Sequence, residues 1–360
     1  MSPQAIGLAS CRYPPGRHGV SVVRLRIAVL APISWRTPPV HYGPWELFAS
    51  LLTEGLVERG HDVTLFATGD SRTGAKLSSV VPHGWSDDPD IDTKVAECLH
   101  IAGVFERANE FDIIHNSFDF LPLTYSDLVD APVVTTIHGF SSQHIVPVYE
   151  KYNRRATYVA ISDADRHPRL NYAATIYHGI DTDAFGLHTP SEPYLLFYGR
   201  IHPDKGTVHA IDVARESGMP LVIAGIVHDQ RYFEEAVAPH IDDRRVRYLG
   251  PIGTDTRSRV LGEAHALLHL VDFDEPFGLS VVEAMACGTP VIAFRRGSMP
   301  ELIDEGVTGM IVDNIEAATA AVAQVGALDR ASIRATAVHR FGRNRMVDEY
   351  LKVYQHVLSR

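Results

Sequence analysis

The sequence has little cysteine and no long apolar run. Its three cysteines, Cys11, Cys98 and Cys287, lie far apart in 360 residues and form no Cys-x-x-Cys pair. A disulfide framework or a zinc knuckle is therefore not expected, and a reducing cytoplasm fits this composition. No apolar stretch approaches the length of about 20 residues that a membrane-spanning helix needs.

The sequence also lacks an excess of positive charge. It has 33 lysines and arginines against 44 aspartates and glutamates, which gives a formal net charge of −11. Broad binding to nucleic acid or to a membrane surface is therefore not expected. The helical stretches predicted over 44–59 and 91–110 carry more acids than bases, so stable membrane association is not expected either. An anionic ligand must be held by local cations and helix N-termini.

Residues 1–23 differ from the rest of the chain. They contain Pro14, Pro15, Gly16 and Gly19, show no periodicity and have no apolar segment after a charged start. We interpret them as a disordered extension and not as a secretory signal.

The remainder is too long for one ordinary core and suits two α/β domains. Short apolar runs alternate with amphipathic stretches, which predicts βαβ units with buried parallel strands. We predict a first Rossmann-like domain over 24–185, a linker over 186–193, a second Rossmann-like domain over 194–342 and a last helix over 343–360. The predicted strands are Arg26–Pro32, Asp62–Ala67, Asp112–His115, Val133–His138, Tyr158–Ser162, Thr175–His178, Tyr194–Gly199, Leu221–Gly225, Val246–Gly250, Leu267–Val271, Val291–Phe294 and Met310–Val312.

Ligands of open α/β sheets bind beyond the carboxyl ends of the strands. Two doubly wound sheets that face each other across a cleft would therefore place the loops after their strands around one ligand. One such loop runs from Glu275 to Glu283 and leads into a helix that we predict to be capped by Ser280. Its amides suit an anion, Glu275 suits sugar hydroxyls, and Glu283 in the first turn suits a ribose diol. The alternatives are a capping box formed by Ser280 and Glu283, and a solvated loop carboxylate at Glu275.

Two other loops follow predicted strands. Gly199 and Arg200 begin the segment that ends at Lys205 and Gly206, whose cations suit a diphosphate; the alternative is a solvated turn. Gly43 precedes a helix that begins with Pro44, which suits a phosphate weakly, because Pro44 lacks an amide hydrogen.

Histidines and paired aspartates give weaker signals. His138, followed by Gly139, and His115 lie at predicted strand ends, where a histidine is either directed into the cleft or merely structural. Two Asp-x-Asp triplets, 181–183 and 272–274, match the pattern of a divalent-metal site. We expect solvated acids and no metal there, because nearby cations already supply positive charge.

Several segments resemble family-4 glycosyltransferases of the two-Rossmann (GT-B) fold. The resemblance runs from about Arg26 to the C-terminus, and the family's order of motifs is kept. The motifs are Arg59-Gly-His-Asp-Val63, Ala160-Ile-Ser162, His178-Gly-Ile-Asp181…Phe185, Gly199-Arg200…Lys205-Gly206, Glu275-x7-Glu283 and Cys287-Gly-Thr-Pro-Val.

The resemblance implies how the second domain would bind a nucleotide-sugar donor. Glu275 would bind hydroxyls of the donor sugar, helped by the amides of Phe277, Gly278 and Leu279, and Glu283 would bind the nucleotide ribose. The catalytic set would comprise His138, Glu275, Arg200 and Lys205. Gly43, Gly199, Phe277, Gly278, Leu279, Ser280 and Glu283 would contact the donor.

The remaining roles follow from the same resemblance. Arg200 and Lys205 would neutralise the departing diphosphate, and His138 would donate to the 6-hydroxyl of the sugar. Gly43 would let the first-domain loop approach the phosphates, although relatives often have two adjacent glycines where this chain has Gly43-Pro44. The last helix would cross back onto the first domain.

The sequence therefore predicts a cytoplasmic glycosyltransferase. It would move a hexose from a nucleotide sugar, with UDP-glucose favoured, to a small-molecule or glycan acceptor in solution, with retention of anomeric configuration. Members of the family usually need no metal, and no cofactor is expected. Two alternatives remain open, a nucleotide-sugar 2-epimerase on the same fold and a non-catalytic two-lobed sugar-binding protein. The acceptor and the oligomeric state are not indicated.

Overall fold

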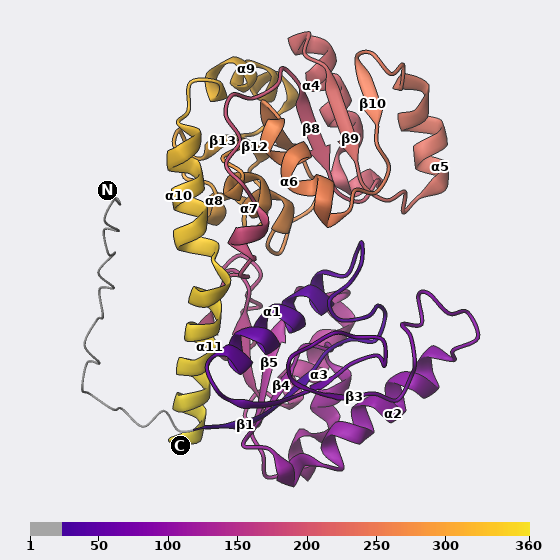
Figure 1. Ribbon diagram of the computed structural model, residues 1–360, viewed down its shortest axis with the longest axis vertical. Coiled ribbons are helices and arrows are strands. Elements are labelled where there is room, and N and C mark those ends of the chain that lie inside the picture. The colour runs from indigo at the N-terminus through magenta and orange to yellow at the C-terminus, as the bar shows by residue number, and fades with distance from the viewer. Residues whose placement is uncertain (1–23) are drawn as a thin grey trace, which may run out of the picture.

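The computed structural model describes residues 24–360, apart from the side chains of residues 254 and 255. The disordered extension predicted over 1–23 lies outside the described residues. Two parallel sheets dominate the structure and form two lobes (Figure 1). Within residues 24–360, no helix combines the length and the apolar character needed to span a bilayer.

The first lobe is built on a seven-stranded parallel sheet with strand order β3-β2-β1-β4-β5-β6-β7. Its core strands are buried at nearly every position, as expected for strands covered on both faces. The strands are β1 Arg26–Leu30, β2 Asp62–Phe66, β3 Lys76–Ser78, β4 Ile113–Asn116, β5 Val133–Ile137, β6 Thr157–Ala160 and β7 Tyr172–Thr175.

The second lobe is built on a six-stranded parallel sheet with strand order β10-β9-β8-β11-β12-β13. Its strands are β8 Leu195–Tyr198, β9 Leu221–Ala224, β10 Val246–Tyr248, β11 Ala266–His269, β12 Val291–Phe294 and β13 Gly309–Val312. Two Rossmann-like sheets in one chain confirm the predicted α/β fold class.

Helices cover both sheets. In chain order they are α1 Pro44–Glu58, α2 Thr93–Phe105, α3 Val146–Lys151, α4 Thr207–Ser217, α5 Gln230–Tyr232, α6 Thr254–Glu263, α7 Leu279–Ala286, α8 Met299–Leu302, α9 Ile315–Val325, α10 Arg330–Phe341 and α11 Arg343–Leu358. The helix α1 begins as its sequence indicates, with Pro44 at the first helical position, and Gly60 with φ of 82° follows its end.

The lobes are joined at two crossings of the chain. One follows β7, and the other lies between α10 and α11 at Gly342. The two crossings pair with each other, because Ile180 donates its amide to the carbonyl of Phe341 at 2.8 Å and Arg343 donates to Ile180 at 3.0 Å. Beyond Gly342, α11 packs on α1 of the first lobe, where Val347 and Tyr350 join its core (Figure 1).

One strand prediction is wrong, and one strand of the structure was not predicted. The strand predicted at Thr175–His178 lies earlier, at Tyr172–Thr175, as a partly exposed edge strand. The apolar residues after it belong to the junction between the lobes, where the ring of Tyr177 lies 6.1 Å from that of Phe277. The short edge strand β3 was not predicted, because its three residues are largely exposed and carry no apolar run.

Candidate functional site

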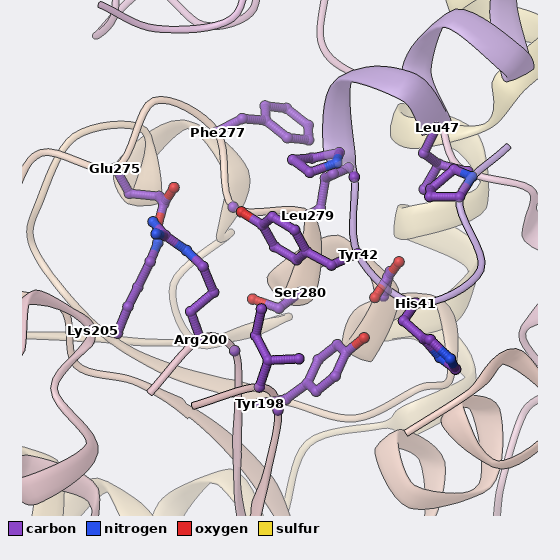
Figure 2. Close-up of a pocket in the computed structure, with 18 of the residues that line it drawn as sticks. His41, Tyr42, Leu47, Tyr198, Arg200, Lys205, Glu275, Phe277, Leu279 and Ser280 are labelled. Carbon is purple, nitrogen blue, oxygen red and sulfur yellow. The ribbon is translucent and has the colours of Figure 1, made fainter. Parts of the chain in front are cut away.

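A cleft of about 680 Å³ separates the two lobes. The loops after β1 and β5 line it from the first lobe, and the loops after β8 and β11 line it from the second lobe. The carboxyl ends of both sheets therefore contribute to one cavity, as expected for open α/β sheets. Figure 2 shows side chains of both lobes in this cleft.

Lys205 and Glu275 meet on the second-lobe wall. Lys205 Nζ lies 2.6 Å from Glu275 Oε2, and the two side chains are 16% and 13% exposed. The ammonium group also lies 4.5 Å from the ring centre of Phe273. Gly206, with φ of 72°, holds this loop against β11, since a Cβ there would lie 1.8 Å from the carbonyl oxygen of Leu270. Only glycine permits this approach.

His269 lies behind this ion pair. Its Nε2 is 3.6 Å from Glu275 Oε2. Burial lowers the pKa of His269 to about 4, although the charge of Glu275 acts in the opposite direction. His269 is therefore neutral near pH 7, and Lys205 is the cation that balances Glu275.

Arg200 lies on the same wall and has no carboxylate partner in the described part of the chain. Tyr42 extends toward it from the first lobe (Figure 2). Burial raises the pKa of the Tyr42 hydroxyl, and the guanidinium of Arg200 opposes this shift. A cation without a carboxylate partner in a cleft is suited to an anionic ligand.

The loop that begins at Glu275 ends at α7. Gly278 caps this helix with φ of 94°, and Leu279 is its first residue. The predicted cap at Ser280 is therefore wrong, because Ser280 is already the second helical residue. The capping-box alternative fails for the same reason, since Glu283 lies in the second turn. Phe277, Gly278, Leu279 and Ser280 all line the cleft.

Glu283 has a buried partner on α6. Arg257 donates to Glu283 Oε1 at 3.2 Å, and the two side chains are 13% and 6% exposed. Burial raises the pKa of Glu283, and Arg257 counteracts this shift. Only one carboxylate oxygen of Glu283 is engaged in a hydrogen bond within residues 24–360, so the other is available to a ligand.

His138 and His178 form a buried pair on the first-lobe wall. His138 Nδ1 lies 3.4 Å from His178 Nε2, and their rings are 5.1 Å apart. Burial lowers the pKa of His178 to about 3 and holds that of His138 well below its ordinary value. Both imidazoles are therefore neutral. His138 Nε2 is buried without a partner among the described residues, and His138 lines the cleft.

The other predicted residues differ in their surroundings. Gly43 lines the cleft with φ of 147°, and a Cβ there would lie 2.9 Å from Pro39. Gly199 also lines it, but nothing lies within 4 Å of its possible Cβ and its φ is not left-handed. His115 is structural, since Tyr354 lies 2.8 Å from its Nδ1 in the core.

The aspartate triplets have local partners. Asp181 accepts from the amide of Asp183 at 3.2 Å. Asp272 Oδ2 lies 2.9 Å from His209 Nε2, and Asp274 accepts from the amide of Gly297 at 3.2 Å. These contacts fix loops around the second lobe.

Sequence reasoning missed Arg36, Tyr42, His178, Arg257 and His269. Arg36 and Tyr42 belong to the loop between β1 and α1 and line the cleft. The rule that ligands bind beyond strand ends would have included them. Arg257 had no such signal, because its role arises from a contact between α6 and α7.

Two Rossmann-like lobes with cations and carboxylates in the cleft between them form a binding site suited to an anionic, hydroxyl-bearing ligand. Residues 46–184 match the family described as Glycosyltransferase Family 4, and residues 181–353 match the one described as Glycosyl transferases group 1. The two matches together extend from 46 to 353, and the chain belongs to the family-4 glycosyltransferases of the GT-B fold.

Individual relatives agree with this assignment. Phosphatidyl-myo-inositol mannosyltransferase of Mycolicibacterium smegmatis is 24% identical, over 92% of this chain and 94% of that protein. HepE of Anabaena, solved with UDP and glucose, is 20% identical with a TM-score of 0.71, over 92% of this chain and 100% of that one. Sucrose-phosphate synthase from Thermosynechococcus elongatus is 18% identical with a TM-score of 0.74, over 93% of this chain and 100% of that one. The two solved structures share the fold.

Proposed function

We propose that this glycosyltransferase is a cytoplasmic enzyme that transfers glucose from UDP-glucose to an acceptor in solution, with retention of anomeric configuration. The observation that supports this most is the second-lobe wall of the cleft, where Lys205 lies 2.6 Å from Glu275 and where Arg200 has no carboxylate partner among the described residues. Two cations suit a diphosphate, and a neighbouring carboxylate suits the hydroxyls of the attached sugar. The Anabaena relative, solved with UDP and glucose, supports this choice of donor.

In this proposal the donor lies across α7. Glu283 accepts hydrogen bonds from the ribose with the carboxylate oxygen that Arg257 leaves available. The amides at the start of α7 and the side chains of Arg200 and Lys205 face the diphosphate. His138 Nε2 meets the hexose from the first lobe. This arrangement includes no metal, because Arg200, Lys205 and the amides at the start of α7 all face the diphosphate.

The reaction passes through an oxocarbenium-like state. The bond between the anomeric carbon and the diphosphate oxygen breaks, and an acceptor hydroxyl forms the new bond on the same face. Its proton passes to the departing phosphate oxygen. Lys205 and Arg200 stabilise the charge that develops on the diphosphate. Glu275 orients the sugar, because its Oε2 already accepts from Lys205. A trapped sugar–Glu275 ester or an inverted product would contradict this mechanism.

The first experiment identifies the donor. Thermal shifts with UDP-glucose, GDP-mannose and ADP-glucose are followed by assays of nucleotide release. We expect UDP-glucose to give the largest shift and to release UDP. Conversion of UDP-glucose into an isomeric UDP-sugar indicates the epimerase instead, and a response to free sugars alone indicates a binding protein.

The second experiment tests the site. We expect Glu275→Gln to lower kcat by about 10²–10³, because the neutral amide no longer matches Lys205 or the sugar hydroxyls. Lys205→Ala is expected to raise the KM of the donor and to lower kcat together. Arg296→Ala, at an exposed position of the same lobe, is the control. Wild-type kinetics in both site variants would remove this assignment.

A further inference from the structure

The first-lobe wall of the cleft carries one permanent charge. Its lining includes Arg36, His41, Tyr42, Trp45 and His138, and it contains no aspartate or glutamate within the described residues. Arg36 follows β1, so it lies beyond the carboxyl end of a central strand of the first sheet. A ligand that reaches this wall therefore meets a guanidinium and no carboxylate, because the nearby Glu46 is buried, with its Oε1 3.3 Å from the amide of Trp35, and does not line the cleft.

Arg36 has no partner in the part of the chain that the structure describes. Its Nε is buried without a hydrogen bond. Arg257 and Arg345 also have an Nε that is buried without a hydrogen bond, but each of them forms an ion pair, with Glu283 and Glu349 respectively. Arg36 differs because no atom of its guanidinium has a partner among the described residues. A buried N–H without an acceptor destabilises the folded protein, so an acceptor supplied by a ligand would remove that penalty.

Among arginines in residues 24–360 that are not exposed, two lack both an ion pair and a hydrogen bond to a carboxylate or carbonyl oxygen. They are Arg36 and Arg200. Both line the same cleft, from opposite lobes. In the proposed function, Arg200 and Lys205 meet the diphosphate on the second lobe. Arg36 then remains available for a second anion on the first lobe.

The segment around Arg36 is held in place. Thr37, which is fully buried, donates its amide to Ser71 Oγ at 2.9 Å and accepts from the amide of Arg72 at 2.8 Å. The backbone that carries Arg36 is therefore fixed before a ligand binds, which lowers the entropic cost of binding.

We propose that the acceptor carries an anionic group, a phosphate or a carboxylate, and that Arg36 binds it. This inference rests on the proposed function, since it assigns the acceptor of that transferase. A guanidinium offers parallel N–H donors that match two oxygens of a phosphate or a carboxylate. The nucleophilic hydroxyl belongs to the same molecule, and the anion fixes its position beside the donor sugar.

The first test measures anion binding on the protein saturated with UDP. UDP binds the cations of the second lobe. Inorganic phosphate is then added to one sample, and sodium chloride at the same ionic strength is added to a second sample for comparison. We expect phosphate to raise the melting temperature of the wild-type complex, and Arg36→Gln to abolish this rise. Arg72→Gln is the matched control, because Arg72 is exposed on the same lobe and is expected to keep the response. An equal phosphate response in Arg36→Gln and wild type overturns the proposal, and so does its absence in wild type.

The second test uses pairs of acceptors. Glucose, myo-inositol and glycerol are each compared with a phosphorylated form, and glycerol also with glycerate, by mass spectrometry of the product. We expect kcat/KM to favour an anionic member by at least about tenfold, a difference of about 1.4 kcal/mol. Arg36→Gln is expected to raise the KM of that acceptor about tenfold and the KM of the donor much less. Preference for a neutral member overturns the proposal.

The outcomes separate the two proposals. If Arg36→Gln raises the KM of the donor more than the KM of the acceptor, Arg36 binds the diphosphate. That result overturns the inference but does not contradict the proposed transferase function. Failure of the protein to bind UDP or to release it from UDP-glucose rejects the proposed function itself. Phosphate binding by Arg36 in the presence of UDP is observable without any knowledge of the acceptor.

Discussion

Glu46 is a buried acid at the third position of α1. It is 3% exposed, and the amide of Trp35 lies 3.3 Å from its Oε1. Burial raises the pKa of Glu46 to about 7. Between pH 4.5 and pH 7 the unfolded chain therefore ionises Glu46 while the folded protein keeps it protonated. The free energy of unfolding falls as the pH rises through this window.

Glu46→Gln is expected to reduce this loss of stability by about 1–3 kcal/mol at pH 8, because the amide has the same shape and no charge to bury. Urea denaturation of both proteins at pH 5 and pH 8 measures the effect. Glu106→Gln, at an exposed position of the same lobe, is the control. If the free energies of unfolding of Glu46→Gln and wild type differ by the same amount at pH 5 and pH 8, the raised pKa of Glu46 is contradicted.

His178 positions His138. The two rings share one hydrogen bond, and the partner nitrogen determines whether His138 Nε2 carries a hydrogen toward the cleft. We expect His178→Ala to lower kcat about tenfold or more with a smaller change in the KM of the donor. His178→Gln is expected to restore part of the rate, because its amide can replace the lost partner. UDP release at pH 6–8 is the assay.

The pH profile provides an independent check on this pair. Burial lowers the pKa of His178 to about 3, so neither histidine gains a proton in the range assayed. An acidic limb near pH 6.5 that disappears in His178→Ala would contradict the neutral pair. A fall of kcat in His178→Gln as large as in His178→Ala would contradict the positioning role.

At the scale of elements, α1 and α11 approach each other closely at Gly55. A Cβ at Gly55 would lie 2.5 Å from Val347 Cγ2. Replacement of a mid-helix glycine by alanine ordinarily stabilises by about 0.5–1 kcal/mol, whereas overpacking costs about 1–3 kcal/mol. We expect the clash to prevail, so that Gly55→Ala lowers the free energy of unfolding by about 1 kcal/mol.

Two further variants test this reason. Gly103 lies in α2 with nothing within 4 Å of its possible Cβ, so Gly103→Ala is expected to stabilise the protein. Val347→Ala should remove the penalty of Gly55→Ala in the double variant. The prediction fails when Gly55→Ala and Gly103→Ala shift thermal and urea denaturation in the same direction.

At the scale of the whole molecule, Glu301 links the lobes. Its carboxylate on α8 accepts from the amides of Asp163 and Ala164 at 2.9 and 2.7 Å and from Tyr177 at 3.1 Å. Nearby, Ser162 donates to the carbonyl of Pro276 at 2.7 Å. These bonds lie beside the loop of Glu275, so they hold the lobes together where the donor would bind.

We expect Glu301→Ala to favour more open arrangements of the lobes and to raise the radius of gyration in small-angle scattering. The amides of Asp163 and Ala164 lose their acceptor, at a cost of about 0.5–1.5 kcal/mol for each bond, because both residues are exposed to water. Glu305→Ala, exposed on the same lobe, is the control. UDP should reduce the difference in radius of gyration between Glu301→Ala and wild type, because a ligand that contacts both lobes favours the closed arrangement. Identical scattering curves for Glu301→Ala and wild type would rule out this role.

The fold was accessible to sequence reasoning because its signals are local. Apolar runs gave eleven of the predicted strands at nearly their observed positions, and Gly60 and Pro44 marked the ends of α1. The apolar run at 175–178 was wrongly predicted to be a strand, because it packs at the junction between the lobes and not in the sheet. Burial produces the same pattern in both places, so the pattern alone does not distinguish them.

The sequence by itself determined the two α/β units and the order of the loops that carry cations and carboxylates, because backbone preference and burial are recorded residue by residue. Only the tertiary structure decided the partners. Lys205 meets Glu275 across 70 positions, and Arg257 meets Glu283 across 26. The same packing left Arg36 Nε without an acceptor within residues 24–360. Which distant side chains meet depends on how whole elements pack, and that information does not reside in any one segment.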